Sequence, residues 1–316
     1  MFFIDFSGVH WQKMNKRLVF ILFFVLVLGC HTTRMAMGDQ TELVCSKPLE
    51  SIKINVFGDS RTPYHIAKLR ILTAIKKEKP DIIMHLGDMV ANASDELWAQ
   101  FDREEGTLKE LGVPFLPIIG NHEILLNHVW NFKGLANYFK RFPELKGSQW
   151  YSYSCGQFKF LGLNSQTDLK SGSPQRVWLE AQLQKTQVTD VVVVSIHEPL
   201  ISAKEKYIND YSDELRPLFA GKQRGGAPVA LVLSGHFHNY ERFIDADVHY
   251  ITSGGGGSPP HFISRLPNDL YSGGDINYEY IRIWIRGGDL LGEMLLYDEN
   301  SDTFSVADTF NWRRVH

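Results

Sequence analysis

Five short polar motifs follow apolar runs along this chain, and each contains a residue type that binds metal ions. They are Gly58-Asp59-Ser60-Arg61, Gly87-Asp88, Gly120-Asn121-His122-Glu123, the lone His197 and Gly235-His236-Phe237-His238. In open α/β sheets, the residues just beyond the carboxyl ends of the strands gather at one edge. The pattern therefore predicts that side chains distant in sequence meet at the end of a sheet.

The segments between the motifs predict strands that alternate with helices. Strands are expected at 52–57, 81–86 and 115–119, with helices at 64–79 and from Ser94 or Asp95 to Leu111. This order implies right-handed crossovers and a parallel sheet covered by helices. Further expected elements are a hairpin at 150–153 and 158–163, helices at 174–185 and 213–220, strands at 190–195 and 230–234, and mostly strands from 250 to 310.

The first thirty residues have the pattern of an export signal. Lys16-Arg17 precedes an apolar run from Leu18 to Leu28, and Gly29-Cys30 follows it. Val27-Leu28-Gly29-Cys30 resembles the bacterial lipobox, which predicts a lipid on Cys30 and a place in the cell envelope. An ordinary cleaved signal, giving a periplasmic or secreted protein, and an uncleaved anchor are the alternatives. Met14 is a possible true start.

The remainder of the chain predicts one large domain. Residues 31–50 lack periodicity and are expected to form a tether, and residues 51–316 are expected to form the domain. The formal net charge of −3 argues against an extended nucleic-acid partner. If Cys30 carries lipid, Cys45 and Cys155 are left either as a disulfide or as two unpaired thiols, and the sequence leaves both open.

The residue types in the motifs are carboxylate, carboxamide and imidazole. These ligands suit iron, manganese or zinc, and they are poor ligands for thiolate-dependent copper chemistry. Taken singly, Asp59 is typical of a turn and His197 of a packed core. The ordered set makes a metal site the better interpretation.

The ordered set resembles the calcineurin-like metallophosphoesterase superfamily over roughly residues 50–300. Tyr240-Glu241-Arg242, which follows the last motif, is similar to the purple acid phosphatase branch. The resemblance implies a four-layer αββα sandwich of two mixed β-sheets flanked by helices. It also implies two divalent or trivalent metal ions, iron, manganese or zinc, that activate a water to hydrolyse a small phosphoester.

The resemblance also implies a role for each site residue. Asp88 bridges the two ions; Asn121, His197 and His236 complete one of them; Asp59 and His238 hold the other. His122 is not a ligand, and it stabilises charge on the phosphate or protonates the leaving oxygen.

Two departures from the superfamily pattern affect the second ion. Arg61 stands where the superfamily usually has a histidine ligand, and Ala91 stands where purple acid phosphatases have a tyrosine ligand. The ion held by Asp59 and His238 is therefore expected to be weaker, more hydrated or bound by a further ligand. Arg61 is instead a candidate to bind the substrate phosphate, because its guanidinium matches phosphate geometry.

These observations predict a metallophosphoesterase that acts on phosphomonoesters. The first alternative is a phosphodiesterase acting on nucleotides or envelope lipids. The second is a non-catalytic surface binding protein with a degenerate metal site, which Arg61 and Ala91 motivate. Tyr207 and Tyr211 are expected either to line the substrate entrance or to be surface residues of a loop. Glu241-Arg242 is expected to form an internal ion pair.

Overall fold

A computed structural model describes residues 41–46, 49–127, 129–221 and 227–313 of the chain. The predicted signal, Cys30 and residues 31–40 of the predicted tether lie outside this part. The described residues belong to one unit, which runs from Gln40 to His316. Within them, no helix has both the length and the apolar character needed to span a membrane.

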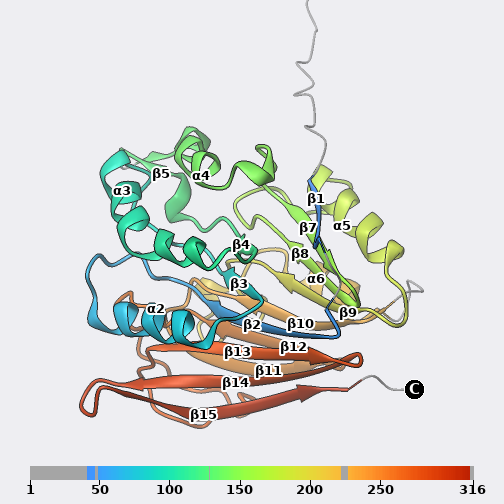
Figure 1. The fold of residues 1–316 in the computed structure, drawn as a ribbon. Coiled ribbons are helices and arrows are strands. Elements are labelled where there is room, and N and C mark those ends of the chain that lie inside the picture. The colour runs from blue at the N-terminus through green and yellow to red at the C-terminus, as the bar shows by residue number, and fades with distance from the viewer. Residues whose placement is uncertain (1–40, 47–48, 128, 222–226, 314–316) are drawn as a thin grey trace, which may run out of the picture. The chain divides into compact units, whose positions relative to one another are not determined.

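Two mixed β-sheets form the centre of the fold (Figure 1). The seven-stranded sheet has the order β1 (Glu42–Val44), β7 (Tyr151–Cys155), β8 (Phe158–Gly162), β9 (Val191–Ser195), β10 (Val229–Ser234), β12 (Val248–Ser253) and β11 (Tyr240–Asp245). The six-stranded sheet has the order β15 (Thr303–Trp312), β14 (Asp289–Asp298), β13 (Glu279–Arg286), β2 (Ser51–Phe57), β3 (Ile82–His85) and β4 (Phe115–Pro117). A short hairpin joins β5 (Leu125–Leu126) to β6 (Val129–Trp130).

Parallel pairing is found where the sequence predicts it. Strands β2, β3 and β4 are parallel neighbours, as are β8, β9, β10 and β12. The C-terminal strands β13, β14 and β15 pair antiparallel. The predicted pair of mixed sheets is therefore confirmed.

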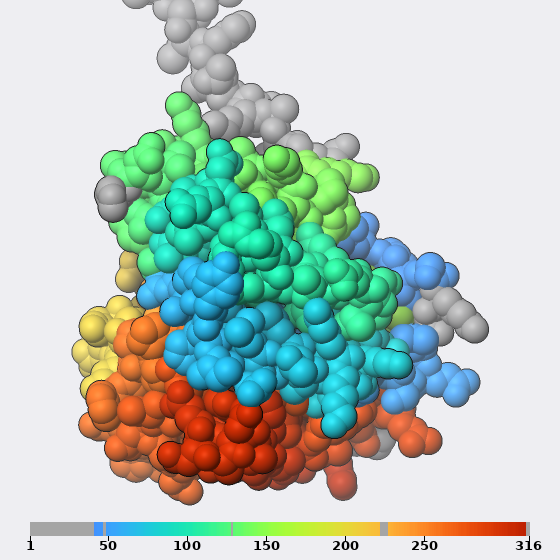
Figure 2. Space-filling view, turned by 60° about the vertical axis from the view of Figure 1, so that its left-hand side comes forward, coloured from blue at the N-terminus to red at the C-terminus, as the bar shows by residue number. Residues whose placement is uncertain are grey.

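The helices are α2 (Ile66–Glu78), α3 (Asp95–Arg103), α4 (Leu135–Arg141), α5 (Pro174–Lys185) and α6 (Ser212–Phe219). Short 3₁₀ turns are η1 (Glu105–Leu111), η2 (His122–Ile124), η3 (Phe132–Gly134), η4 (Pro143–Leu145) and η5 (Glu205–Tyr207). Ser94 caps α3, because its hydroxyl accepts a hydrogen bond from Leu97 N–H at 3.4 Å. On the surface, α2 lies next to the red C-terminal strands (Figure 2), where Arg70 pairs with Asp302 at 2.6 Å.

The four valines of β9 show how the layers are built. Val191 and Val193 pack into the large core that contains residues of both sheets and of α2 and α3. Val192 and Val194 pack into a second core with residues of α5 and α6. Because successive strand residues face opposite sides of a sheet, this single apolar run contributes side chains to both cores.

The predicted helix 95–111 is interrupted. The α-helix ends at Arg103, and the 3₁₀ segment η1 continues to Leu111. Glu104 leaves helical geometry, with φ −104° and ψ −84°. The cause is tertiary, because Glu104 and Glu105 are buried and both lie against the ammonium group of Lys68.

The prediction of a tether over 31–50 is wrong for residues 42–44. These residues form β1, which pairs in parallel with β7. Cys45 is joined to Cys155 by a disulfide, which selects one of the two states that the sequence left open. The bond and the strand pairing fasten the start of the described chain to the middle of the domain.

Candidate metal centre

The motif residues follow strands of both sheets. Asp59, Asp88 and Asn121 come after β2, β3 and β4 of the six-stranded sheet. His197 and His236 come after β9 and β10 of the seven-stranded sheet. The site therefore lies where the carboxyl ends of two sheets meet, whereas the sequence pattern suggested one sheet edge.

Three of these residues have left-handed backbone conformations. The φ angle is 55° at Asp59, 57° at Asp88 and 66° at His236. Residues other than glycine adopt this region uncommonly, and such strain is concentrated at functional sites. Each turn places a side chain directly beyond the end of its strand.

Four side chains that can act as metal ligands meet on one side of the site: Asp88, Asn121, His197 and His236. We call this group the first ion position. His197 Nε2 lies 3.3 Å from Asp88 Oδ1 and 3.2 Å from Asn121 Oδ1. His236 Nδ1 lies 3.0 Å from the same Asn121 oxygen. These distances confirm that the strand ends bring the four side chains together.

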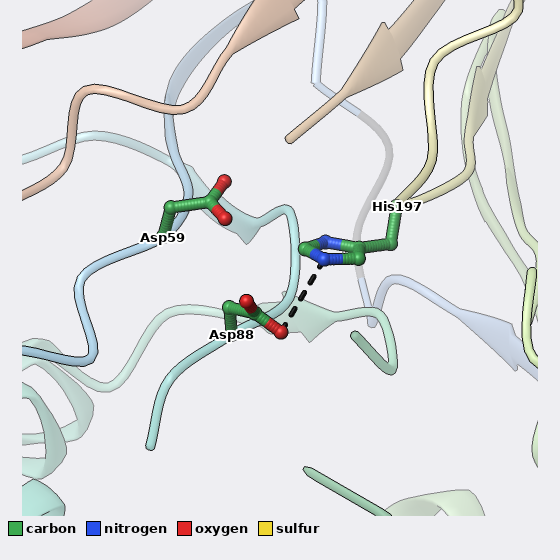
Figure 3. A group of neighbouring side chains, drawn as sticks. All are labelled: Asp59, Asp88 and His197. Carbon is green, nitrogen blue, oxygen red and sulfur yellow. Dashed lines mark ion pairs between the residues drawn. The ribbon is translucent and has the colours of Figure 1, made fainter. Parts of the chain in front are cut away.

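The donor set of the first ion position fits a cation. His197 Nδ1–H donates to the carbonyl oxygen of Leu86 at 2.6 Å, so a neutral ring presents the lone pair of Nε2 to two oxygen acceptors. The lone pair of His197 Nε2 and the oxygens of Asp88 and Asn121 would repel one another at 3.2–3.3 Å unless positive charge lies between them. Asp59, Asp88 and His197 also place ligand atoms within 4.8 Å of one another (Figure 3).

The electrostatics of the buried groups agree with this requirement. Burial alone would lower the pKa of His197, but the Asp88 and Asp59 carboxylates raise it to about 10. A proton therefore occupies His197 when no metal ion does. Burial lowers the pKa of His236 and of His238 to about 3, so both rings are neutral and can act as ligands.

The other side of the site is the second ion position, formed by Asp59, His238 and the shared Asp88. His238 Nδ1–H donates to Pro259 O at 2.9 Å, which turns its Nε2 toward Asp59 Oδ1 at 3.5 Å. Asp59 Oδ2 accepts the backbone N–H of His236 at 2.8 Å, while Oδ1 is buried without a hydrogen-bond partner. Burial raises the pKa of Asp59 well above its ordinary value.

Arg61 and His122 both face Asp88. Arg61 Nη1 lies 3.2 Å from Asp88 Oδ2, and His122 Nε2 lies 3.8 Å from the same oxygen. The His122 ring is held by an Nδ1–H bond to Ala91 O at 2.6 Å. Although burial opposes ionisation of Asp88, the charges of His197, His122 and Arg61 hold its pKa well below the ordinary value.

Comparison with known proteins places this site in a family. The family model for calcineurin-like phosphoesterases matches residues 52–240, more than half of the chain. The chain belongs to the calcineurin-like phosphoesterase family. This confirms the resemblance given by the motifs.

The relatives of this chain include purple acid phosphatases. Probable purple acid phosphatase 20 of Arabidopsis thaliana is 30% identical over 181 residues, covering 54% of this chain and 42% of the relative. Probable inactive purple acid phosphatase 9 of the same plant is 26% identical over 232 residues, covering 62% of this chain and 35% of the relative. The chain thus spans less than half the length of these relatives.

A solved structure has the same fold. The purple acid phosphatase from yellow lupin seeds superposes with a TM-score of 0.63 at 19% identity. The match covers 83% of this chain and 53% of the lupin protein. At this level of identity, the comparison establishes the fold.

Glu123 supports the turns of the candidate metal centre. Its buried carboxylate accepts the backbone N–H groups of Asp88 at 2.9 Å, Met89 at 2.7 Å and Gly120 at 2.7 Å. One side chain thereby joins the turn after β3 to the turn after β4. Glu123 therefore has a structural role at the site.

Two further histidines lie close to the motif residues. His85 is buried and contacts Ser60 Oγ at 2.8 Å through Nε2. His261 stacks on His238 with ring centres 4.3 Å apart, and its Nδ1 accepts the His238 N–H at 3.3 Å. His261 follows Pro259-Pro260 in a loop, where no spacing pattern could reveal it.

The loop 201–212 reaches the site through Tyr207. Its ring packs edge-on against His236 at 5.4 Å and stacks on His261 at 5.2 Å. Tyr211 instead donates its hydroxyl to Asp168 at 3.0 Å. Tyr207 therefore packs beside a residue of the first ion position, whereas the hydrogen bond of Tyr211 leads to Asp168.

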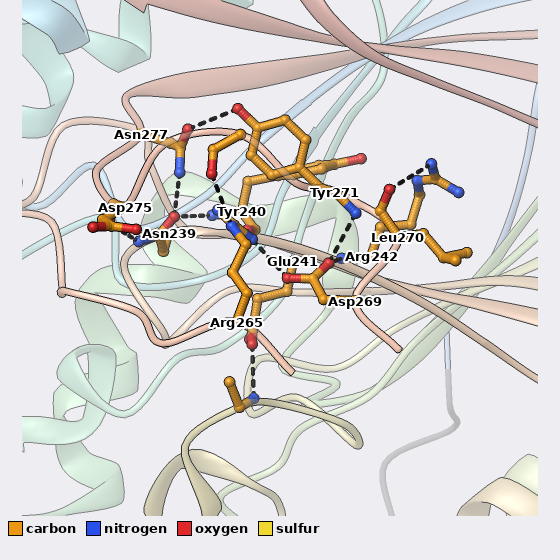
Figure 4. A network of polar contacts seen from close by, with 12 residues as sticks. Asn239, Tyr240, Glu241, Arg242, Arg265, Asp269, Leu270, Tyr271, Asp275 and Asn277 are labelled. Atoms are coloured by element: carbon orange, nitrogen blue, oxygen red, sulfur yellow. Dashed lines mark hydrogen bonds and ion pairs between the residues drawn. The ribbon is translucent and has the colours of Figure 1, made fainter. Parts of the chain in front are cut away.

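The predicted Glu241–Arg242 ion pair is wrong. Glu241 is buried and accepts hydrogen bonds from Ser202 Oγ at 2.8 Å and Ala203 N–H at 2.7 Å. Arg242 pairs with Asp308 at 2.6 Å instead. Successive strand residues face opposite sides, so these neighbours have separate partners. The surrounding polar network contains Asn239, Asn277, Tyr271, Asp269 and Arg265 (Figure 4).

The glycine run 254–257 packs under the first turn of the site. Gly256 N–H donates to Gly58 O at 2.9 Å, and Ser258 N–H donates to Asp59 O at 2.9 Å. A Cβ atom at Gly256 would lie closer than 3.0 Å to Gly58 O. The two backbone segments therefore approach each other too closely for a side chain at Gly256.

Proposed function

We propose that this protein hydrolyses phosphoesters, preferentially phosphomonoesters, at a metal centre with two ion positions that share Asp88. The observation that carries the proposal is the first ion position, where carboxylate, carboxamide and imidazole groups converge from both sheets. Family membership supports the same chemistry. A bound metal ion supplies Lewis-acid activation of phosphate and water at such a site.

Two side chains of this protein are placed to assist the reaction. With Nδ1 of His122 committed to Ala91 O, its Nε2 is the atom that would carry a proton to the leaving oxygen. Burial lowers the pKa of His122, whereas the Asp88 carboxylate acts to raise it, and a bound phosphate anion would act in the same direction as Asp88. Arg61 would contribute guanidinium N–H groups to the phosphate oxygens.

A chromogenic substrate tests the proposal. Purified protein is treated with EDTA, reloaded with Mn²⁺, Zn²⁺ or Fe²⁺, and assayed with p-nitrophenyl phosphate and its bis-ester. We expect metal-dependent turnover of the monoester, reduced roughly 100-fold or more in Asp88→Asn, because that variant loses the shared carboxylate. Preference for the bis-ester would instead favour the phosphodiesterase alternative.

The non-catalytic alternative makes a different prediction for the same assay. Its motivation is Arg61 at a ligand position, and the relatives include a probable inactive purple acid phosphatase of Arabidopsis thaliana. Metal binding without turnover of either ester would favour this binding function. Lys133→Ala, an exposed change on the η3 turn, serves as a control that leaves the ion positions intact.

We further propose that the protein is exported and anchored by a lipid on Cys30. The signal pattern supports export, and the Cys45–Cys155 disulfide agrees with an oxidising compartment. Mass analysis of the mature N-terminus tests the proposal, since Cys30→Ser should abolish the lipid. An unmodified Cys30 in the mature protein would contradict it.

A further inference from the structure

The two oxygens of Asp88 face different partners. Oδ1 points to the first ion position, where it lies 3.3 Å from His197 Nε2 and accepts the His122 N–H at 3.0 Å. Oδ2 lies 3.2 Å from Arg61 Nη1. One oxygen of the carboxylate that a second metal ion would share is therefore already paired with a positive charge.

Arg61 is held in this place by the turn that precedes it. Asp59 N–H donates to Gly87 O at 3.0 Å, and Ser60 Oγ contacts His85 Nε2 at 2.8 Å. Both residues are fully buried, whereas the Arg61 side chain is 22% exposed. Among the described residues, Asp88 is the sole ion-pair partner of Arg61. The backbone of the motif thus directs the guanidinium onto Asp88.

The second ion position has few remaining ligands. It offers Asp59 Oδ1 and His238 Nε2 in addition to the Asp88 oxygen that Arg61 contacts. Ala91 brings only a methyl group, and its carbonyl oxygen accepts from His122. His261 is stacked on His238, and its Nδ1 is committed to the His238 N–H. The first ion position therefore offers four protein ligands, whereas the second ion position offers fewer.

The positive charge of Arg61 acts on the second ion position. Arg61 Nη1 lies 3.2 Å from an oxygen of Asp88, the carboxylate that a second ion would share. The guanidinium would therefore repel a divalent cation at this position, and such repulsion is strong for charges a few ångströms apart in a partly buried setting. Ligand shortage and electrostatic repulsion therefore act in the same direction.

We propose that the guanidinium of Arg61 takes the place of the second metal ion beside Asp88, so that the protein binds one ion tightly. A second ion is expected to bind at least ~100-fold more weakly. This inference rests on the proposed function only for its catalytic meaning. The remaining N–H groups of Arg61 make no other hydrogen bond among the described residues and are free to contact a phosphate oxygen.

Metal stoichiometry tests the inference without an activity assay. The full chain, freed of metal, is titrated with Mn²⁺ by calorimetry, and bound metal is counted after gel filtration. The wild type should retain one ion per chain and give the six-line paramagnetic resonance spectrum of an isolated Mn²⁺. Two ions of comparable affinity, or a spectrum of two coupled ions, would overturn the inference.

Three variants of one residue separate charge from ligand effects. Arg61→His removes the charge and supplies a ligand, so its second ion should bind within about tenfold of the first. Arg61→Met removes the charge alone and should strengthen the second ion by a smaller factor. Arg61→Lys keeps the charge and should retain one ion. Unchanged stoichiometry in Arg61→His would count against the inference.

The outcomes also distinguish this inference from the proposed function. One tight ion without hydrolysis would sink the proposed function and leave the role of Arg61 supported. Hydrolysis with two equally tight ions would do the reverse. No bound ion in the wild type would overturn both.

Discussion

Gly120 is a position where one added carbon atom should damage both the fold and the ion site. A Cβ there would lie closer than 3.0 Å to Asp88 Oδ1, Asp88 N and Glu123 Oε2. The Gly120 N–H also donates to Glu123 at 2.7 Å. Gly120→Ala must therefore displace either the Asp88 carboxylate or the Glu123 bond that joins two turns of the site.

The expected loss can be estimated from these contacts. Overpacking a buried site costs about 1–3 kcal/mol, and weakening a hydrogen bond to a buried carboxylate costs about 1.5–3 kcal/mol. We therefore expect Gly120→Ala to lower the free energy of unfolding by roughly 3–5 kcal/mol. Urea denaturation in EDTA measures this change apart from metal binding, and Mn²⁺ titration of the folded fraction should show a weakened first ion.

Gly274→Ala is the matched control. A Cβ at Gly274 meets no atom within 4 Å, so this variant should unfold and bind Mn²⁺ like the wild type. The reasoning is refuted if Gly120→Ala loses less than ~1 kcal/mol and keeps the metal affinity of the wild type. That result would mean that the turns after β3 and β4 do not approach each other as described.

Two further predictions concern stability. Replacing Cys45 and Cys155 by serine opens a link across 110 residues, which should lower the free energy of unfolding by about 2–5 kcal/mol. Urea curves with and without reductant check this, and insensitivity of the wild type to reductant would contradict it. Burial raises the pKa of Glu279 from 4.5 to about 7, although the hydrogen bonds from Ser253 and Gly255 act to lower it. Because the folded-state pKa is the higher one, wild-type stability should fall as pH rises from about 4.5 to 7, by roughly 3 kcal/mol for this group. Glu279→Gln should remove that part of the slope in EDTA, and an unchanged slope would show that Glu279 does not titrate there.

The convergence of the motif residues could be predicted because it depends on a simple regularity. Each of Asp59, Asp88 and His197 follows an apolar run, and the strand ends of an α/β sheet gather at its carboxyl edge. The four consecutive valines of β9 likewise made the buried strand visible in the sequence. These features need only local pattern and the periodicity of a strand.

The features that escaped prediction depend on tertiary partners. The break after Arg103 follows from two glutamates turning toward Lys68, which no local propensity encodes. Strand β1 is three residues long and is fixed by its pairing and by the disulfide. His261 reaches His238 through a loop, and Glu241 finds its partners on the segment after His197. Such contacts become visible only when the chain is folded.

Arg61 shows the same division between sequence and structure. The motif identified it as a departure at a ligand position and left open whether it binds phosphate or marks a weak ion site. The 3.2 Å contact with Asp88 Oδ2 makes the two roles compatible. The guanidinium supplies positive charge at this oxygen in place of a metal ion, and its other N–H groups remain available to a substrate.

The central claim is that side chains from two sheets build a metal site around Asp88. Crystals grown with Mn²⁺ and measured by anomalous diffraction test it most directly. We expect a strong anomalous peak at the first ion position and a weak peak or none at the second. Absence of a peak at the first ion position, in crystals saturated with Mn²⁺, would contradict the claim.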